Sequence, residues 1–428
     1  MQAHFYGIDF GTTNSVLSIY DRNRKEIIKT FSIPSILYFP IHQNSGNSIQ
    51  TLVGNDAIKA YMDDGMKGRL MKSIKQVLAI PSFTETRIGN QQFTASDLVS
   101  LLLLDLKKKA DLFIGYACYS AIIGRPVFFD DENSTKDKLA QTRLLLAAEK
   151  AQFSSIRFQF EPISAAFAYE KLLSKKEKVL VADLGGGTTD FTLIELDPLK
   201  SGIVDRRSDI IATGGVYVGG DSLDASFMWA KGTPHFGRGV KYESMPGKMA
   251  DLPTSFFQNI CSWKEMNFFN GPKVRNSVNQ YYVYTKRNKL VKNLITLIDN
   301  NLGFSLFQAI EKTKIELSEK CKSSFYFSRN EIEINEEIEL DEYNSIIQPD
   351  IFAIQKYLNQ FLETNQINIS EIDSLFITGG TSLVGAIQTL FKENFPLIPI
   401  QTGDNFLSVS QGLALSEYLF NDYDEVTF

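Results

Sequence analysis

The chain has 428 residues, which is too long for one compact core and predicts two lobes or several subdomains. A hydrophobic content of 43% and an aromatic content of 12% exclude global disorder. The net charge of −6 and the lack of a long basic block argue against nucleic acid as the main partner.

The cysteines and histidines exclude further classes of site. Cys118, Cys261 and Cys321 lie far apart with no Cys-x-x-Cys, which argues against a disulfide framework and a cysteine zinc site. The three histidines are also scattered, so we expect no protein-ligated transition metal. Because no secretory leader precedes the first strand and the longest apolar run covers only residues 101–104, we expect a cytoplasmic protein without membrane contact.

The first predicted element is a hairpin over residues 5–20, FYGIDFGTTNSVLSIY. Asp9 ends its first strand, and the glycine turn follows. Glycines let backbone N–H groups approach a phosphate closely, and a carboxylate at a strand end suits a hydrated Mg²⁺. The turn residues are Gly11, Thr12, Thr13 and Asn14.

The next segments alternate between short strands and helices. We expect a strand pair at 27–31 and 35–39, a polar loop at 42–50, a short strand turning into a helix at 52–60, a basic flexible stretch at 65–79, and a helix that a capping box at 94–97 begins. A strand at 119–124 then ends at Pro126, and a helix at 136–152 leads to a strand at 156–160. Glu161 opens the following helix, where an acid that faces the helix dipole is the structural alternative to a functional role.

The strongest motif is a second hairpin over residues 179–194, VLVADLGGGTTDFTLI. Asp183 ends its first strand, and Thr188 and Asp190 follow the glycines Gly185, Gly186 and Gly187. It repeats the design of the first hairpin, so we expect two related halves that face each other across a shared polyphosphate and metal. A plain glycine-rich hairpin is the structural alternative for this stretch alone.

The remaining candidate residues lie on three later segments. Gly219, Gly220 and Asp221 precede a helix, and Gly379 and Gly380 follow an apolar strand, as anion-contacting turns do. Glu311, Lys314 and Ser318 share one face of a predicted helix at 303–319, where a solvent-exposed salt bridge is the alternative. We further expect an edge hairpin at 325–334, a helix at 342–363, and a glycine-, proline- and aromatic-rich span at 230–300 whose aromatics Phe256, Phe257, Trp263, Phe268 and Phe269 form local core.

These motifs resemble the actin-like ATPase superfamily, specifically the nucleotide-binding domain of DnaK-type (seventy-kilodalton heat-shock) chaperones, over nearly the whole chain. IGRPVFFDDE (123–132) and FQFEPISAAFAYE (158–170) are most similar to short YegD-type homologues that lack a peptide-binding domain. The resemblance implies an α/β fold of duplicated ribonuclease H-like halves with the nucleotide in the central cleft. Lobe I would cover 1–172 with a small subdomain at about 34–96, lobe II 173–402 with one at about 213–339, and a C-terminal helix at 403–428 would return to lobe I.

The resemblance also implies a role for each candidate residue toward ATP or ADP with Mg²⁺. Asp9 and Asp183 would hold Mg²⁺, while the glycine turns and their threonines would bind the phosphates. Lys75 would contact the γ-phosphate, with Lys72 as the alternative if the alignment slips. Glu161 and Asp190 would position the attacking water, and Glu311, Lys314 and Ser318 would contact the ribose and adenine.

Two departures and several alternatives remain. Ile315 and Leu383 stand where the chaperones stack arginines on adenine, a loss of about 1–2 kcal/mol in base affinity that leaves base selectivity open. The main hypothesis is a monomeric, slowly hydrolysing chaperone-like ATPase whose lobe closure a protein client or co-chaperone reads. A nucleotide-dependent regulatory module with little turnover, a small-molecule kinase and a filament-forming protein are the alternatives. The Glu311–Lys314–Ser318 triplet favours the chaperone type over kinases, and the expected lack of a peptide-binding domain favours the regulatory module. The span 230–300 is expected to be longer than in the chaperones.

Overall fold

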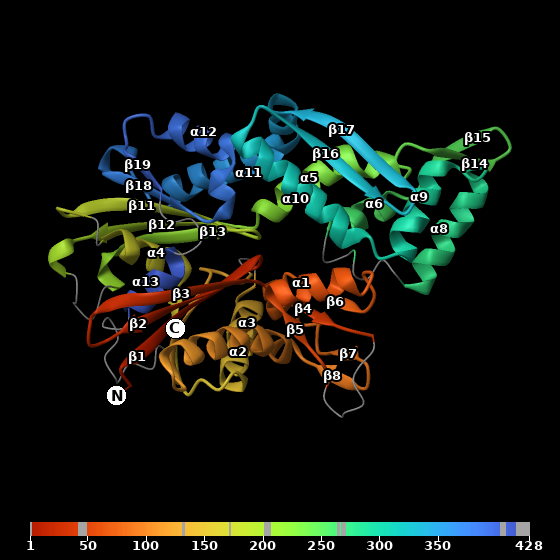
Figure 1. The fold of residues 1–428 in the computed structure, drawn as a ribbon. Coiled ribbons are helices and arrows are strands. Elements are labelled where there is room, and N and C mark those ends of the chain that lie inside the picture. Colours follow the sequence, from red (N-terminus) through yellow and green to blue (C-terminus); the bar gives the residue numbers. More distant parts are fainter. Residues whose placement is uncertain are drawn as a thin grey trace.

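A computed structural model describes residues 2–41, 49–130, 133–170, 173–200, 207–262, 266, 271–402 and 408–416 (Figure 1). Most of the expected polar loop at 42–50 therefore lies outside the described residues. The same holds for Trp263, Phe268 and Phe269, and for the expected C-terminal helix except residues 408–416.

The first of two five-stranded sheets has the strand order β10-β9-β1-β2-β3. Its central strand β1 pairs antiparallel with β2, as the first hairpin predicts, and parallel with β9. Helices α2 and α3 bury one face of this sheet, and α4 and α13 bury the other. The bounds are β1 His4–Phe10, β2 Asn14–Asp21, β3 Glu26–Pro34, β9 Ser120–Arg125, β10 Ser155–Phe160, α2 Ala95–Ile114, α3 Ser134–Lys150, α4 Glu161–Glu170 and α13 Ser408–Leu415.

The second sheet, β13-β12-β11-β18-β19, repeats this arrangement. Its central strand β11 pairs antiparallel with β12 and parallel with β18, as β1 does with β2 and β9. One apolar cluster joins residues of both sheets to α4 and α13, so these two helices lie between the sheets (Figure 1). The bounds are β11 Glu177–Leu184, β12 Thr189–Leu196, β13 Ile210–Val216, β18 Ser374–Thr378 and β19 Ile400–Thr402.

Smaller elements extend each half beside the central cleft. On the first half these are β4 Ile36–Phe39, β5 Leu52–Val53, α1 Gly54–Asp63, β6 Arg69–Lys72, the 3-10 helix η1 Ile74–Ala79, β7 Thr86–Ile88 and β8 Gln91–Phe93. On the second half they are α5 Gly220–Phe227, the π-helix η4 Met228–Gly232, the 3-10 helix η5 Thr233–Phe236, β14 Lys241–Met245, β15 Lys248–Asp251, α6 Thr254–Cys261, α8 Pro272–Tyr284, α9 Lys289–Asp299, α10 Gly303–Glu319, β16 Lys322–Arg329, β17 Ile332–Glu339, α11 Leu340–Thr364 and α12 Gly385–Asn394.

Two expectations for residues 27–79 were wrong. The strands at 27–31 and 35–39 do not pair, because β3 pairs with β2 whereas β4 pairs with β5 and β6. Only Ser35 separates β3 from β4, which leaves no room for the turn of a hairpin. Ser35 is held instead by the first glycine turn, since its N–H donates to the Thr13 carbonyl at 2.8 Å and its hydroxyl to the Gly11 carbonyl at 2.7 Å. The stretch at 65–79, expected to be flexible, contains β6 and η1.

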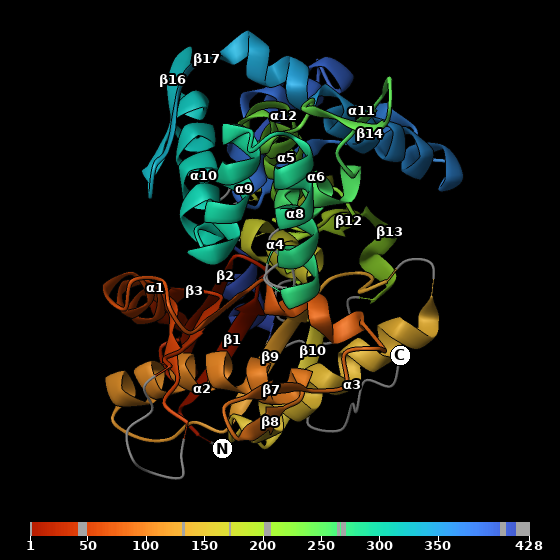
Figure 2. The same ribbon diagram turned by 90° about the vertical axis from the view of Figure 1, so that its right-hand side faces the viewer.

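Helices α1 and α10 come from the two halves and face each other (Figure 2), and an apolar contact joins them. The ring of Tyr61 on α1 meets the ring of Phe304 on α10 edge to face, with centroids 5.8 Å apart. Both rings are buried in one small cluster with Tyr38. Next to it, the Ser305 hydroxyl contacts the Met66 sulfur at 3.1 Å. The two halves therefore meet over the cleft as well as through α4 and α13.

Candidate functional site

The tips of the two glycine hairpins face each other at the bottom of the cleft. A Cβ atom added to Gly186 would lie only 2.7 Å from the Thr13 hydroxyl oxygen, and one added to Gly187 would lie 3.5 Å from the Thr12 hydroxyl oxygen. The halves approach so closely here that a side chain at position 186 would force Thr13 to move. Four hydroxyl or backbone groups from two remote segments thus surround one small volume.

Some backbone donors of the glycine turns hold the turns together. The Gly185 N–H donates to the Thr188 carbonyl at 2.9 Å, and the N–H groups of Gly220 and Asp221 donate to the Gly185 and Gly186 carbonyls at 3.1 and 2.7 Å. In the described part of the chain, no protein acceptor binds the N–H groups of Gly186 and Gly187. These two donors remain available to an anion.

The third glycine turn packs directly against the central hairpin. Gly379 has φ +85°, and a Cβ atom there would lie 2.2 Å from the Leu184 carbonyl oxygen and 2.8 Å from Asp183 Oδ1. Only glycine tolerates both this backbone conformation and this contact. The Thr381 hydroxyl then donates to the Gly185 carbonyl at 2.8 Å, which fixes the start of α12 beside the cleft.

Four buried or half-buried carboxylates converge below the hairpin tips, and one lysine enters among them. Lys75 Nζ lies 2.6 Å from Glu161 Oε1, with both side chains about nine-tenths buried. Burial raises the pKa of Asp183 to about 8, helped by the charges of Glu161 and Asp190. Burial and Glu161 also raise the pKa of Asp190 to about 7, and burial with Glu161 raises the pKa of Asp9 well above its usual value. Burial alone would lower the pKa of Lys75, but Glu161 and Asp9 raise it overall.

This excess of negative charge fits a divalent cation. Four carboxylates face one ammonium, so ionising all of them in a buried site requires further positive charge. Among the residues that the structure describes, no three Asp, Glu, His or Cys side chains converge closely enough to ligate an ion directly. The donor set therefore suits Mg²⁺ held through its own water molecules, as Mg²⁺ prefers.

These groups line a cavity of about 560 Å³ between the two halves. Every candidate residue from the sequence contributes to its wall except Gly219, which lies behind the turn, where a Cβ atom would be 2.7 Å from two carbonyl oxygens. Lys72 lines the cavity as well as Lys75, but only Lys75 has an ion pair among the described side chains. Gln388, which the sequence did not single out, lines the end near α12.

The far end of the cavity has an aliphatic character. Ile315 and Leu383 both line it with exposed fractions of 55% and 43%. On the same wall, Lys314 Nζ forms an ion pair with Asp224 at 2.7 Å, and the Ser318 hydroxyl donates to the Lys314 carbonyl at 3.1 Å.

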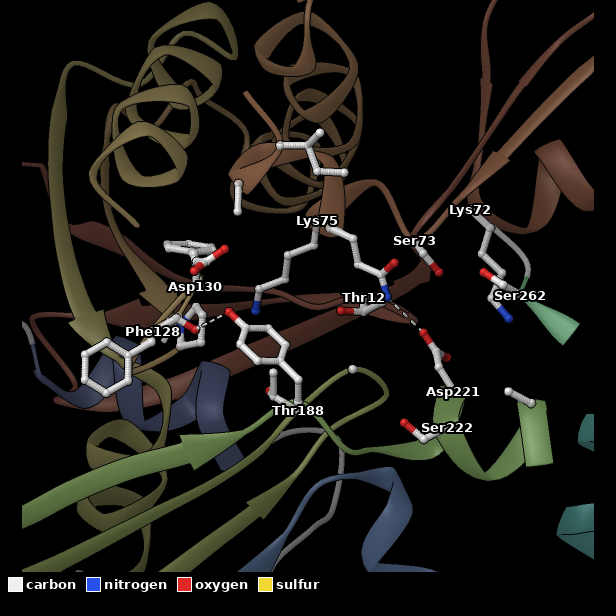
Figure 3. Close-up of a pocket in the computed structure, with 18 of the residues that line it drawn as sticks. Thr12, Lys72, Ser73, Lys75, Phe128, Asp130, Thr188, Asp221, Ser222 and Ser262 are labelled. Atoms are coloured by element: carbon white, nitrogen blue, oxygen red, sulfur yellow. Dashed lines mark hydrogen bonds between the residues drawn. The ribbon is translucent and has the colours of Figure 1, made fainter. Parts of the chain in front are cut away.

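A hydrogen bond crosses the cleft next to the hairpin tips (Figure 3). Gln76 on η1 donates from Nε2 to Asp221 Oδ2 on α5 at 3.1 Å. Burial raises the pKa of Asp221 to about 6, while Lys72 opposes the shift. Sequence reasoning did not identify this contact, because a neutral glutamine beside a lysine has no distinctive pattern.

The fold agrees with comparison to known proteins. A family model described as Hsp70 protein matches residues 5–229 and 272–418. The chain belongs to the Hsp70 family. It has the actin-like ATPase fold of the Hsp70 nucleotide-binding domain, with the two five-stranded sheets as its duplicated halves.

The Hsp70 relationship is distant and partial. The chain is 26% identical over 424 residues to the chaperone protein DnaK of Thermosipho melanesiensis, a match that covers 96% of this chain. The chain spans 58% of the length of that relative. Residues 230–271 lie outside the ranges that the Hsp70 family model matches. No helix in the described ranges is long and apolar enough to cross a bilayer.

Proposed function

We propose that this Hsp70-family chain is a Mg²⁺-dependent ATPase with slow turnover, and that a protein client or co-chaperone senses the closure of its lobes. The observation that carries the proposal is the Lys75–Glu161 pair beside three further carboxylates, at the meeting point of two glycine hairpins. Membership in the Hsp70 family supports ATP as the nucleotide.

The phosphates would be bound by the groups that the protein leaves available. Thr12, Thr13 and Thr188 offer hydroxyls, and Gly186 and Gly187 offer N–H groups. Asp9 and Asp183 would hold Mg²⁺ through its waters. When bound, Mg²⁺ would supply positive charge that stabilises the phosphate oxygens during hydrolysis. The Ile315–Leu383 end would hold the base, with Glu311, Lys314 and Ser318 near the ribose.

The hydrolytic step would rely on positioning and electrostatics. Lys75 would turn part of its hydrogen bonding from Glu161 to the γ-phosphate. The Glu161 carboxylate would then accept a hydrogen bond from a water, and Asp190, itself held by the Thr188 hydroxyl at 2.9 Å, would orient the same water. The water oxygen bonds to the γ-phosphorus, the bond to the β-phosphate oxygen breaks, ADP leaves with the electron pair, and the water proton passes to a carboxylate.

The test is single-turnover hydrolysis of ATP, with GTP and ADP binding measured in parallel, on the wild type and the Asp183→Asn variant. We expect Mg²⁺-dependent release of phosphate by the wild type and none by the variant. Wild-type turnover in Asp183→Asn would overturn the metal assignment. Tight ATP binding without turnover in the wild type would instead identify a nucleotide-gated binding module.

A further inference from the structure

A second, larger cavity adjoins the nucleotide site on the side away from the base. Its volume is about 730 Å³, within the range of small-molecule sites. It shares Thr12, Lys75 and Thr188 with the nucleotide cavity, so the two spaces meet at the phosphate end (Figure 3). Its wall includes Cys261 and Ser262, which belong to the segment that the Hsp70 family model leaves unmatched.

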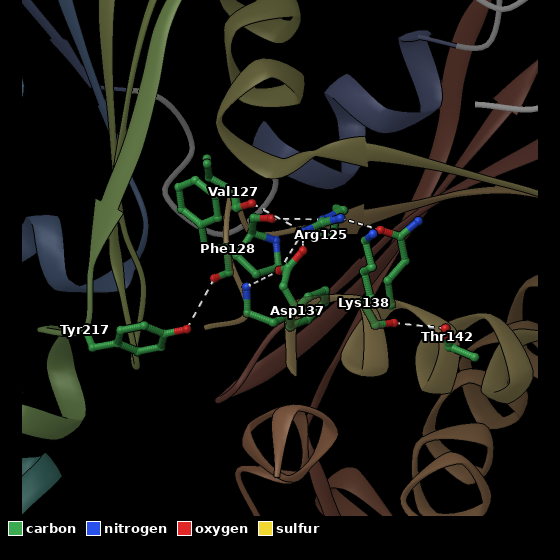
Figure 4. A network of polar contacts seen from close by, with 10 residues as sticks. Arg125, Val127, Phe128, Asp137, Lys138, Thr142 and Tyr217 are labelled. Carbon is green, nitrogen blue, oxygen red and sulfur yellow. Dashed lines mark hydrogen bonds and ion pairs between the residues drawn. The ribbon is translucent and has the colours of Figure 1, made fainter. Parts of the chain in front are cut away.

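Each half of the molecule contributes one partly exposed aromatic ring to this cavity, whereas Phe129 and Phe307, which also line it, are buried. Phe128 follows β9 and Tyr217 follows β13, and their exposed fractions are 42% and 46%. The Tyr217 hydroxyl donates to the Phe128 carbonyl at 3.5 Å across the cleft (Figure 4). Two large rings left partly uncovered inside a concavity favour a ligand with an apolar face.

The turn that carries Phe128 is held rigidly from behind (Figure 4). Arg125 contacts both oxygens of Asp137 at 2.8 Å and donates to the Val127 carbonyl at 3.3 Å. The same carboxylate accepts the Phe129 N–H at 2.7 Å. Since this network is largely buried, the ring of Phe128 projects from a fixed backbone, and the cavity wall on this side is preformed.

The charges in the cavity disfavour an anion. Lys136 pairs with Asp130 at 2.7 Å, and Lys75 pairs with Glu161 at 2.6 Å. Lys72 lies on the wall shared with the nucleotide cavity, where bound phosphates would attract it. Those phosphates would repel a second anion a few ångströms away. The other polar groups include the hydroxyls of Ser73 and Ser222.

From these observations we propose that the cavity binds a second small molecule, a neutral compound that carries several hydroxyl groups and one apolar face. Its apolar face would contact Phe128 and Tyr217, and its hydroxyls would exchange hydrogen bonds with the serines and with Asp130. Because the two rings come from different halves, the ligand binds only when the halves are closed. The ligand and the nucleotide then stabilise the same closed arrangement, and each raises the affinity for the other. This coupling rests on the proposed nucleotide binding, whereas the ligand site itself does not.

The test uses myo-inositol and D-glucose as neutral probes and D-glucose 6-phosphate as the anionic comparison. We expect at least one neutral probe to lower the Kd for Mg-ADP about fivefold, the low end of typical coupling, in the wild type. The Phe128→Ala variant should bind Mg-ADP normally and lose this effect. Tyr217→Ala should lose it relative to Tyr217→Phe, which lacks the same cross-cleft hydroxyl but keeps the ring. Tyr326→Ala, which removes a tyrosine exposed on β16, is the matched control and should keep it.

Three results would overturn the proposal. They are a wild-type Kd that no neutral probe changes, an equal effect in Tyr217→Ala and Phe128→Ala, and a stronger effect of the phosphorylated sugar. Saturation-transfer NMR of the same probes on the nucleotide-free protein tests the ligand site independently of the proposed nucleotide function. If Mg-ADP fails to bind while the probes still give signals that Tyr217→Ala abolishes, the proposed nucleotide function fails and the ligand site stands.

Discussion

Replacing Lys75 by alanine removes the ammonium that lies among four carboxylates in the described part of the chain. Its partner Glu161 is only 10% exposed, so the variant leaves a nearly buried carboxylate without its counter-ion. Breaking such a pair typically costs about 3–5 kcal/mol of folding stability. The loss of folding stability is smaller at low pH. Asp183 and Asp190, with pKa values of about 8 and 7, then bind protons and no longer repel the Glu161 carboxylate. We therefore expect the Lys75→Ala variant to lose more stability at pH 8 than at pH 6.

The same substitution should slow hydrolysis by about 10²–10³-fold, the effect of losing one charge-stabilising donor in a transition state. ATP binding should survive, since the hydroxyls and N–H groups of the hairpins remain. Urea denaturation at the two pH values and single-turnover hydrolysis at saturating ATP measure the two effects separately.

Lys72→Ala is the matched control. Lys72 lines the same cavity, but no ion pair of its side chain occurs among the described residues, so its loss should change stability by less than about 1 kcal/mol. Hydrolysis by Lys75→Ala at the wild-type rate would refute the reasoning. Loss of hydrolysis in Lys72→Ala alone would move the γ-phosphate contact to Lys72.

Three further predictions concern other parts of the site. Gln76→Ala removes the hydrogen bond to Asp221 across the cleft, which is worth about 0.5–1.5 kcal/mol. ADP release, measured by stopped-flow displacement, should therefore be about 2–10-fold faster. An unchanged rate would show that this bond does not hold the cleft closed. Ile315→Arg should restore a cation over the base and strengthen ADP binding by about 0.5–1 kcal/mol in calorimetry, whereas weaker binding would contradict the placement of the base. In the folded wild type without nucleotide, Asp190 keeps a proton up to a pKa of about 7, whereas the unfolded chain releases it at about pH 4, so wild-type stability falls as the pH rises from 5 to 7. Asp190→Asn has no such proton, so its stability relative to the wild type should rise over the same range. A difference in urea denaturation that does not change with pH would contradict the raised pKa.

The parts of the fold that the sequence predicted are those whose pattern is local. The hairpin at 179–194 is present as β11 and β12, since glycines between two apolar runs leave few alternatives. The helix at 303–319 has the predicted bounds, Gly303–Glu319, and the capping box of Thr94 with Asp97 begins α2. In the span 230–300, however, α6, α8 and α9 were not predicted. None of them contains a glycine and their one proline, Pro272, begins α8, so the other glycines and prolines of the span lie between the helices and do not interrupt them.

The unpredicted features of the site depend on contacts between remote segments. Lys75 and Glu161 are 86 positions apart, and Gln76 and Asp221 are 145 apart, so no spacing rule pairs them. The resemblance indicated Lys75 and Glu161 as separate functional residues, but only the folded chain brings them together. The sequence wrongly predicted that β3 and β4 pair with each other for a similar reason. Ser35, between them, is held by a turn more than twenty residues earlier.

The contact of Tyr61 with Phe304 has a thermodynamic consequence for nucleotide exchange. Under the proposed nucleotide function, separation of α1 and α10 during ADP release would bring both buried rings into water. Exposure of apolar surface raises the heat capacity of the open state relative to the closed one. The enthalpy of opening then grows with temperature, so a plot of the logarithm of the release rate against reciprocal temperature should be curved. In such a molecule, warming alone would promote nucleotide exchange more steeply at high temperature than at low temperature.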